Sequence, residues 1–371
     1  MKKKFILVIV LVSVLAVVLA YNYYAMRTRN AVEELIRDKK MINILVAGGN
    51  EYNKNRHRFL SIVSINPINN KIGITFIPPG YKVNMGGDDF VKIDEIDFLY
   101  FNRIRDTFRD NLKMNVPFYI KLYSSDMKRI VNLLEGIDLF VLEQKDNSNK
   151  TGFGVHYFDG DKTMMYINNV PDKSIYIKYD RVLDILFSLY DKKEQYRHLH
   201  NPEFITELFK SVKTNLMPQE LYELGRIVYK EGGLIATLLP GGIEGDYYVT
   251  DDISYRIYEK EFLQGIILDK KTEPLIKVKL LNGTDIPGLA RKMRNILIRD
   301  GINVLEFGTS PYERLDYSII INRRGNYDAV MKVAETTGIN KIYHIIDSTE
   351  LNNVLIIIGK DYIGDQGANA K

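Results

Sequence analysis

The chain of 371 residues contains no cysteine and no tryptophan. Without cysteine it has no structural disulfide, no thiolate metal ligand and no cysteine nucleophile. Its formal net charge is only +4, from 51 Lys and Arg against 47 Asp and Glu, which argues against a nucleic-acid partner. The sequence also contains no P-loop, no Gly-x-Ser-x-Gly and no His-Glu-x-x-His motif. These absences exclude several common enzyme classes from a chain long enough for two or three domains.

One long apolar run is present, and it lies near the N-terminus. Lys2 to Lys4 precede an uninterrupted apolar stretch from Phe5 to Ala20, and three tyrosines follow it closely. With its flanks the stretch reaches about 20 positions, the length that spans hydrocarbon. Basic residues before such a stretch favour an N-terminus inside the cell. We therefore predict a single-pass anchor within residues 1–26 and extracytoplasmic main domains, with a signal peptide cleaved after Ala20 as the alternative.

The centre of the sequence predicts a layered α-β-α domain with a central mixed sheet, over residues 42–265. A polar connector, residues 27–41, precedes it and is predicted to be helical from Ala31 to Lys39. Two apolar runs read as strands covered on both faces, and Pro78 stops a third strand. A polar segment from Glu143 to Gly160 predicts a long loop. The expected strands are Asn43 to Ala47, Phe59 to Ile65, Lys71 to Ile77, Phe118 to Leu122 and Ile137 to Val141. The expected helices are Ile93 to Asn111 and Ser125 to Leu134. The expected buried residues are Ile62, Val63, Ile65, Ile74 and Phe76.

A linker rich in Lys and Asp, residues 266–274, separates the last part of the chain. Residues 275–371 predict a small α/β domain with the order β-α-β-β-α-β. Its first strand is Lys277 to Leu281, and its last is Val354 to Ile358. Pro287 is expected to begin the first helix, because a missing N–H costs nothing there.

Several strings of this chain resemble the LytR-CpsA-Psr family. The strings RFLSIVSINPINNKIGITFIPPGYKV, YIKLYSSDMKRIVNLLEGIDLFV and TLLPGGIEGDYYVT resemble its catalytic domain, and VKLLNGTDIPGLARKMRNILIRDGINVLEFG resembles its small C-terminal domain. The resemblance implies a membrane-anchored protein that works with polyprenyl-pyrophosphate glycolipids and cell-wall glycans. In that family arginines clamp the phosphates and an aspartate holds Mg²⁺.

The charged positions of the family motifs are not kept in this sequence. Arg58 stands where the family has its metal-binding aspartate, and a cation cannot bind Mg²⁺. Pro79 and Gly80 stand in place of an arginine and an aspartate, and Asp180 in place of a second arginine. The resemblance therefore predicts no metal site and no cofactor here, and no catalytic residue is assigned.

A few cations remain at motif positions. Lys92 matches a family lysine, Lys178 replaces an arginine, and Arg197 matches an arginine. With Arg58 these are the substrate-binding candidates, and Arg56 is a further cation nearby. Asp94 replaces a family asparagine beside Lys92, and His200 replaces a second arginine after Arg197. Isolated lysines and arginines are more often solvated surface residues than ligands.

Three functions are compatible with this pattern. The first is a catalytically degenerate family member that binds glycan or polyprenyl-linked glycan at the outer face of the cytoplasmic membrane. The second is an active glycopolymer phosphotransferase that has rebuilt its phosphate site from Lys92, Lys178, Arg197 and Arg58. The third is a partner-binding module that works through the C-terminal domain. Convergence of these side chains near a carboxylate would favour the second.

Overall fold

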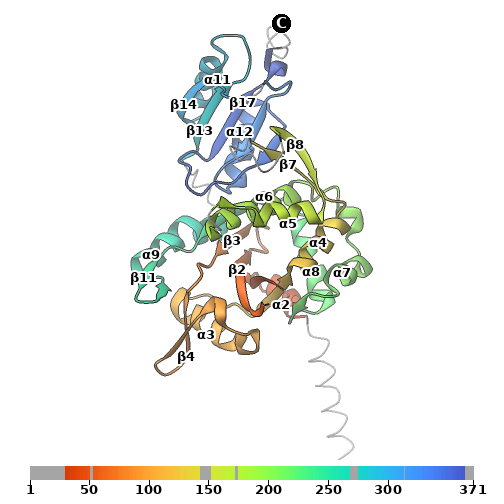
Figure 1. Cartoon of the computed structure of the whole chain (residues 1–371), viewed down its shortest axis with the longest axis vertical. Helices are drawn as coiled ribbons and strands as arrows, with labels where there is room; N and C mark the ends of the chain where they lie inside the picture. The colour runs from red at the N-terminus through yellow and green to blue at the C-terminus, as the bar shows by residue number, and fades with distance from the viewer. Residues whose placement is uncertain are drawn as a thin grey trace, which may run out of the picture.

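The computed structural model describes residues 30–50, 53–142, 152–171, 174–267, 275–312 and 314–363, and of residues 50, 53–58 and 363 it describes the backbone alone. A larger domain and a smaller C-terminal domain lie one above the other (Figure 1). Helix α6 (Ile175–Asp191) runs between them in that view. The predicted anchor in residues 1–26 lies outside the described residues. Within the described ranges, no helix is both long and apolar enough to span a bilayer.

A six-stranded mixed sheet forms the centre of the larger domain, in the order β10-β3-β2-β1-β6-β9. Neighbours β1, β2 and β3 pair antiparallel, whereas β6 lies parallel to β1 and β10 parallel to β3. The mixed α/β fold with a central mixed sheet is therefore confirmed. The strands are β1 (Ile42–Asn50), β2 (Asn53–Ile65), β3 (Ile72–Phe76), β6 (Phe118–Tyr123), β9 (Lys213–Thr214) and β10 (Leu234–Leu238).

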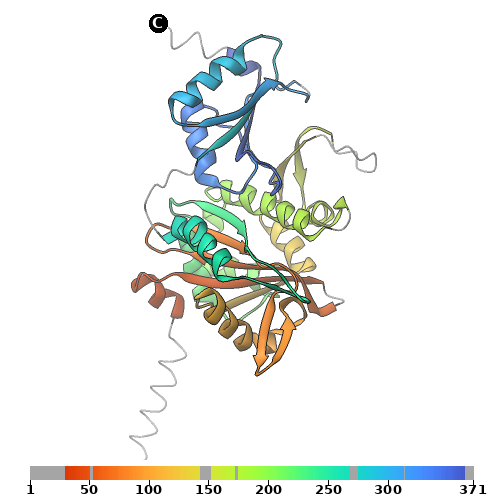
Figure 2. The same ribbon diagram turned by 90° about the vertical axis from the view of Figure 1, so that its left-hand side faces the viewer.

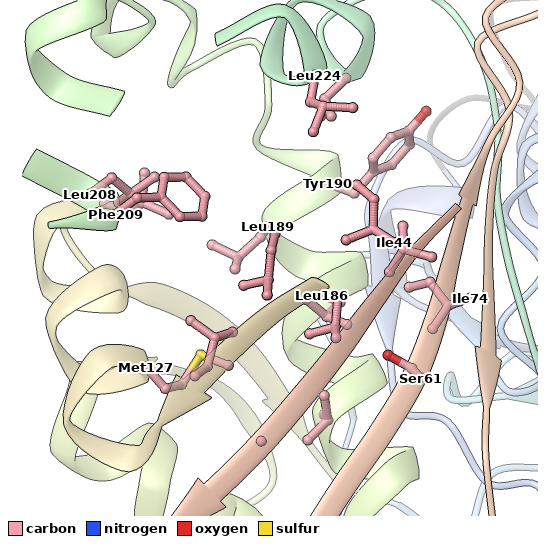
Figure 3. A pocket seen from close by; sticks show the side chains of 18 of the residues that line it. Ile44, Ser61, Ile74, Met127, Leu186, Leu189, Tyr190, Leu208, Phe209 and Leu224 are labelled. Atoms are coloured by element: carbon pink, nitrogen blue, oxygen red, sulfur yellow. The ribbon is translucent and has the colours of Figure 1, made fainter. Parts of the chain in front are cut away.

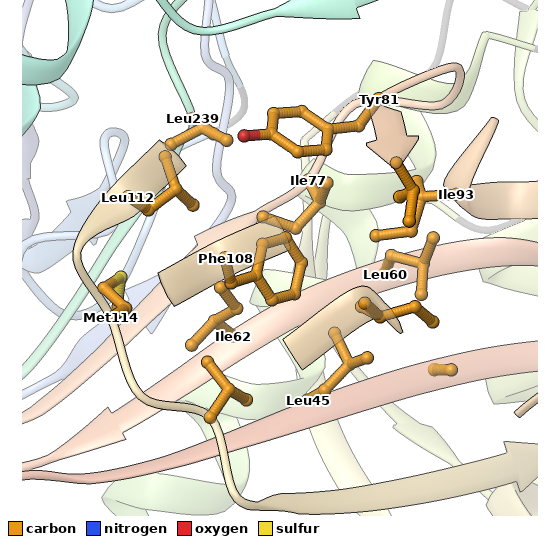
Figure 4. Close-up of a cluster of buried hydrophobic side chains, with 14 of the residues drawn as sticks. Leu45, Leu60, Ile62, Ile77, Tyr81, Ile93, Phe108, Leu112, Met114 and Leu239 are labelled. Atoms are coloured by element: carbon orange, nitrogen blue, oxygen red, sulfur yellow. The ribbon is translucent and has the colours of Figure 1, made fainter. Parts of the chain in front are cut away.

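Both faces of this sheet are covered, which explains why its strands are apolar throughout. Along β1, Leu45 and Ala47 belong to one hydrophobic cluster, while Ile44 and Val46 belong to the cluster on the opposite face. Helix α3 (Phe101–Leu112) covers the first face, where Tyr81 and Phe108 are buried (Figure 4). Helix α6 and helix α8 (Pro218–Val228) contribute to the second. We call these the closed face and the hollow face, because a cavity described below lies on the second.

Helices and hairpins surround this sheet (Figure 2). The helices are α2 (Ala31–Arg37), α3 (Phe101–Leu112), α4 (Ser124–Leu133), α5 (Gly160–Asn168), α6 (Ile175–Asp191), α7 (Pro202–Phe209), α8 (Pro218–Val228), α9 (Asp252–Tyr258) and α10 (Gln264–Ile267). Single turns are η1 (Ile93–Glu95), η2 (Phe98–Tyr100), η4 (Arg197–Leu199) and the π-helical η5 (Glu259–Leu263). The hairpins are β4 (Lys82–Gly86) with β5 (Asp89–Lys92), β7 (Ile137–Val141) with β8 (Gly154–Phe158), and β11 (Gly242–Glu244) with β12 (Tyr247–Val249).

The C-terminal domain has a five-stranded sheet in the order β14-β13-β17-β15-β16. One face packs against its helices in a cluster that includes Val278, Leu280, Met293 and Val330. Its elements are β13 (Lys277–Asn282), α11 (Leu289–Arg299), β14 (Asn303–Thr309), β15 (Ile319–Asn322), α12 (Tyr327–Thr337), β16 (Ile342–His344), β17 (Val354–Ile358) and η6 (Lys360–Ile363).

Four local expectations were wrong. The helix predicted from Ile93 begins only at Phe101, because Ile96 and Asp97 are extended and separate two single turns that precede it. The segment from Glu143 to Gly160 contains β8, which is held as a strand by pairing with β7. The C-terminal order gains the short strand β16, and α11 begins two residues after Pro287.

Most of the predicted core is buried. Ile62, Ile65, Ile74 and Phe76 are at most 4% exposed. Val63 is only half-buried, because it lines the cavity on the hollow face.

Candidate functional site

A cavity of about 920 Å³ lies on the hollow face of the central sheet, between the sheet and helices α4 to α8 (Figure 3). The volume is at the upper end of the range for small-molecule sites. Strands β1, β2 and β3 form its floor through side chains such as Ile44, Ser61, Val63 and Ile74. These residues alternate along each strand with residues of the closed face. The cavity floor is therefore formed by every second side chain of the core strands.

Helix α6 borders the cavity along most of its length. Its lining residues Lys178, Val182, Leu186 and Leu189 recur at helical spacing, and Tyr190 lies beside them. From Lys178 to Tyr190 the helix rises by about 18 Å, at about 1.5 Å per residue. The cavity is therefore elongated along α6, and its middle is apolar. Further apolar lining residues are Ile120, Leu122, Met127, Leu134, Met164, Ile167, Phe204, Ile205, Leu208, Phe209, Leu221, Leu224, Val228 and Leu234.

Lys178, in the first turn of α6, borders one end of the cavity. A ring cluster fixes this turn against the sheet, because Tyr179 stacks on Phe76 at 4.4 Å and meets Phe59 edge-on at 5.6 Å. The Tyr179 hydroxyl donates to the Ile77 carbonyl at 3.0 Å, and burial raises the pKa of this phenol. The first turn of α6, and with it the Lys178 backbone, is thus held in place.

Lys193 and aromatic residues border the opposite end. Lys193 Nζ donates to the Lys230 carbonyl at 2.9 Å and to the Tyr190 hydroxyl at 3.2 Å, and burial lowers the pKa of this ammonium group. His200 stacks on Tyr222 at 4.5 Å, and burial lowers the pKa of the imidazole as well. Burial therefore disfavours the charged form of both groups at this end.

The predicted cations do not gather in one place. Arg197 is exposed at the Lys193 end, where its Nη2 donates to the Tyr229 carbonyl at 2.9 Å and pairs with Glu194 at 3.1 Å. Since α6 alone is about 25 Å long, Arg197 and Lys178 are at opposite ends of the cavity. Lys92 lies outside the cavity lining, in β5 opposite Lys82. The Arg58 side chain, like that of Arg56, lies outside the described part of the chain.

Two positions that carry charged residues in the family's motifs have other roles here. Gly80 adopts a left-handed backbone conformation, with φ of 81°, and its N–H donates to Asp94 Oδ1 at 2.7 Å. Asp180 accepts from the N–H and hydroxyl of Ser348, both at 3.1 Å, and burial raises the pKa of its carboxyl. Asp94 thus binds the backbone of its own domain, and Asp180 binds the C-terminal domain.

The residues around these motif positions do not fit Mg²⁺. That ion needs several oxygen ligands, whereas Arg58 is a cation, Gly80 has no side chain and Asp94 is a single carboxylate already bonded to an amide. Within the described ranges, no group of three Asp, Glu, His or Cys side chains is close enough to hold a metal ion.

Sequence reasoning did not identify the cavity or Lys193. The signal available was the stripe of Val182, Leu186 and Leu189 on α6, bracketed by Lys178 and Lys193. An apolar stripe at helical spacing reads as ordinary core, so that pattern alone does not reveal an unfilled space.

Comparisons with known proteins give one family match and several structural likenesses. Residues 275–362 match the LytR_C family, described as LytR cell envelope-related transcriptional attenuator. The predicted relationship to the LytR-CpsA-Psr proteins is thereby confirmed for the C-terminal domain. No curated protein matches the chain.

Solved structures are similar to a larger part of the chain. B. subtilis TagV shares 19% identity over 62% of this chain and 99% of its own, with a TM-score of 0.48. TagT bound to LIIa-WTA shares 18% over 61% and 90%, with a TM-score of 0.49. Lmo1026 from Listeria monocytogenes, a putative transcriptional factor, shares 15% over 62% and 98%, with a TM-score of 0.47.

Proposed function

We propose that this chain, whose residues 275–362 match LytR_C, is a membrane-anchored, extracytoplasmic LytR-CpsA-Psr protein that binds a polyprenyl-linked glycan without transferring it. The observation that carries the proposal is the elongated apolar cavity along α6, with Lys178 at one end. An isoprenoid chain is long and apolar along its whole length, so it matches such a cavity. The sequence motifs of residues 56–83 and 119–141 support the family assignment.

Lys178 supplies the charge for a lipid phosphate at its end of the cavity. A lysine ammonium group binds phosphate as a point charge, without the two-pronged geometry of arginine. Such a contact holds a phosphate but stabilises a pyrophosphate leaving group poorly, since the arginine and aspartate positions of the family motif are Pro79 and Gly80 here. Binding without turnover follows from this chemistry.

Lipid binding to the full-length chain in detergent tests the proposal. The ligands are a long-chain polyprenyl phosphate and the matching uncharged polyprenol. Lys178→Ala should weaken binding of the phosphate roughly ten-fold, as expected for the loss of a charged hydrogen bond, and leave the alcohol unchanged. Lys193→Ala and Arg197→Ala are the matched controls at the opposite end, and each should change binding less than about two-fold.

Filling the cavity gives the second arm of this test. Leu186→Trp combined with Leu189→Trp should abolish binding of both ligands, because both side chains border the cavity. Leu99→Trp, at a position that is 86% exposed, is the control for the added indole. Failure of wild type to bind either lipid, or equal binding by the filled variant, would refute the proposed function.

An active phosphotransferase is the competing function. It predicts glycan transfer that EDTA or Arg197→Ala abolishes, because a rebuilt site would need a metal and every remaining cation. The proposal predicts no turnover with a polyprenyl-pyrophosphate glycan and no gain in Tm from Mg²⁺ alone. Measured glycan transfer that is abolished by EDTA or by Arg197→Ala would favour the active phosphotransferase.

A further inference from the structure

Helix α6 has a second face, and it is occupied by the C-terminal domain. Asp180, Asp184, Phe187 and Asp191 recur along it at helical spacing. At about 100° per residue, the centre of this set lies about 175° around the helix from that of Lys178, Val182, Leu186 and Leu189. One helix therefore separates the cavity from the C-terminal domain.

Three carboxylates of α6 bind alternate residues of one extended segment. His344 Nε2 donates to Asp191 Oδ2 at 2.5 Å, and the Ile346 N–H donates to Asp184 Oδ1 at 2.5 Å. Ser348 donates to Asp180 as described above. From Asp180 to Asp191 the helix rises by about 16 Å, and residues 344 to 348 span about 13 Å when extended. The two elements therefore run antiparallel over similar lengths.

These contacts satisfy the edge of the C-terminal sheet. Strand β16 is an edge strand, and the chain after it keeps bonding to its own domain through alternate amides: the Ile345 N–H donates to the Asn322 carbonyl, and the Asp347 N–H to that of Arg323. The remaining amides, Ile346 and Ser348, point to α6. Unpaired N–H groups at a sheet edge can pair with a strand of another chain. Here the carboxylates of α6 accept from these N–H groups instead.

The same contacts reach the other walls of the cavity. Asp184 is fully buried, and its Oδ2 also accepts from the Tyr166 hydroxyl of α5 at 2.5 Å. Met164, Ile167 and Asn168 of α5 line the cavity. The side chain of Ile346, although it comes from the C-terminal domain, is buried in the hydrophobic cluster of the hollow face.

A second contact buries the free face of the C-terminal sheet. Phe140 of β7 packs into a cluster with Ile319, Ile321 and Leu355. Its neighbours Leu139 and Val141 pack on the other side, in a cluster with Val182 and Ile185 of α6. Strand β7 is therefore held between α6 and the C-terminal sheet.

We infer that the C-terminal domain is the outer support of the cavity, so that its docking on α6 and the occupation of the cavity stabilise each other. The mechanism is linkage: a ligand that fits the supported form of α6 best also favours the docked domain, by the same factor. The identity of the filling ligand rests on the proposed function, but the support of α6 does not.

The test weakens docking without touching the cavity. The double variant Asp180→Ala, Asp191→Ala removes two of the three carboxylates from the docking face of the full-length chain. Asp110→Ala with Asp316→Ala is the matched control, because both are exposed carboxylates, 67% and 72%, that pair with neighbouring cations. Amide hydrogen exchange reports the segment 344–348 and the middle of α6 separately.

Without ligand, the double variant should exchange faster at Ile346 and Ser348 and also in α6 from Val182 to Leu189, while the control resembles wild type. With a long-chain polyprenyl phosphate, wild type should gain protection at Ile346 and Ser348, and the double variant should bind roughly five- to ten-fold more weakly. Faster exchange in the segment with unchanged α6 would overturn the inference, as would equal affinity of variant and wild type. If wild type binds no lipid but α6 loosens with the segment, the proposed function fails and the support of α6 stands.

Discussion

The two faces of the central sheet are built from the same strands and the same residue types, yet one is closed and the other hollow. Ile62 and its neighbour Val63 show the contrast, since Ile62 is fully buried on the closed face and Val63 borders the cavity. The difference comes from the covering helices. Phe108 and Leu112 of α3 reach the closed face with no exposure, whereas α6 lies across a cavity and is supported from behind. The apolar composition of the strands therefore explains why both faces of the sheet are covered. The helices over each face decide whether the space between helix and sheet is filled.

The largest expected effect comes from removing a ring on the closed face. Phe108→Ala should lower the free energy of unfolding by about 3–5 kcal/mol, because the ring is fully packed (Figure 4). Leu189→Ala on the hollow face should cost less than about 1 kcal/mol, since its side chain already borders empty space. Urea midpoints of the two variants measure the difference. Equal losses would mean that the hollow face is as tightly packed as the closed one.

Adding volume should also destabilise the closed face more than the hollow face. Ile62→Phe should destabilise by about 1–3 kcal/mol, because the closed face has no room for a larger ring. Val63→Phe should change stability by less than about 0.5 kcal/mol and reduce polyprenyl phosphate binding, since the ring enters the cavity. The thermal midpoint and the lipid affinity are measured together for both variants. A destabilised Val63→Phe with intact binding would contradict the assignment of the cavity.

The smallest effect is a pH dependence that belongs to the support of the hollow face. Burial raises the pKa of the Asp184 carboxyl to about 7, against about 3.9 in an unfolded chain. Because the folded state holds this proton more tightly, the contribution is complete below about pH 4 and is lost as pH rises through about 7. Tm should therefore fall between about pH 5 and pH 8.

The measurement for this effect is the difference between two Tm profiles. Asp184→Asn cannot titrate and should flatten the fall, whereas Asp316→Ala, at an exposed carboxylate, should leave it unchanged. Burial shifts the pKa of Asp180 in the same direction, so a shallow residual slope is expected in Asp184→Asn. Identical profiles for wild type and Asp184→Asn would show that this carboxyl does not cause the fall.

The strands and the C-terminal domain could be predicted because their signals are local. Alternating and continuous apolar runs, with Pro and Asn at their ends, located β1, β2 and β3 to within a few residues, apart from an early start of β2. Strand β8 was missed because it is short and follows a polar stretch, and its pairing partner β7 could not be known from the sequence. The three-residue strand β16 is too short to give a pattern.

The candidate site was less predictable because its contacts are between residues far apart in the sequence. In the sequence, Asp180 is notable only because the resembling family has an arginine at this position. Its hydrogen-bond partner Ser348 lies 168 positions away, so the contact could not be predicted. The cavity arises from the distance between α6 and the sheet, which residue types do not encode. Lys178 was identified from a motif position, and its place at the cavity end could not be known from that position.

The alternation of residues 344, 346 and 348 against α6 also selects one alignment of the two domains. A slip of one residue would turn every side chain of the segment to the opposite side. Ile346 would leave the core, and the carboxylate of Asp347, which now pairs with Arg323, would face the acidic side of α6. Like charges would then meet in a buried place, at a high cost. Asp180, Asp184 and Asp191 thus select the observed alignment of the two domains, because they accept backbone amides and a histidine and would repel the misaligned segment.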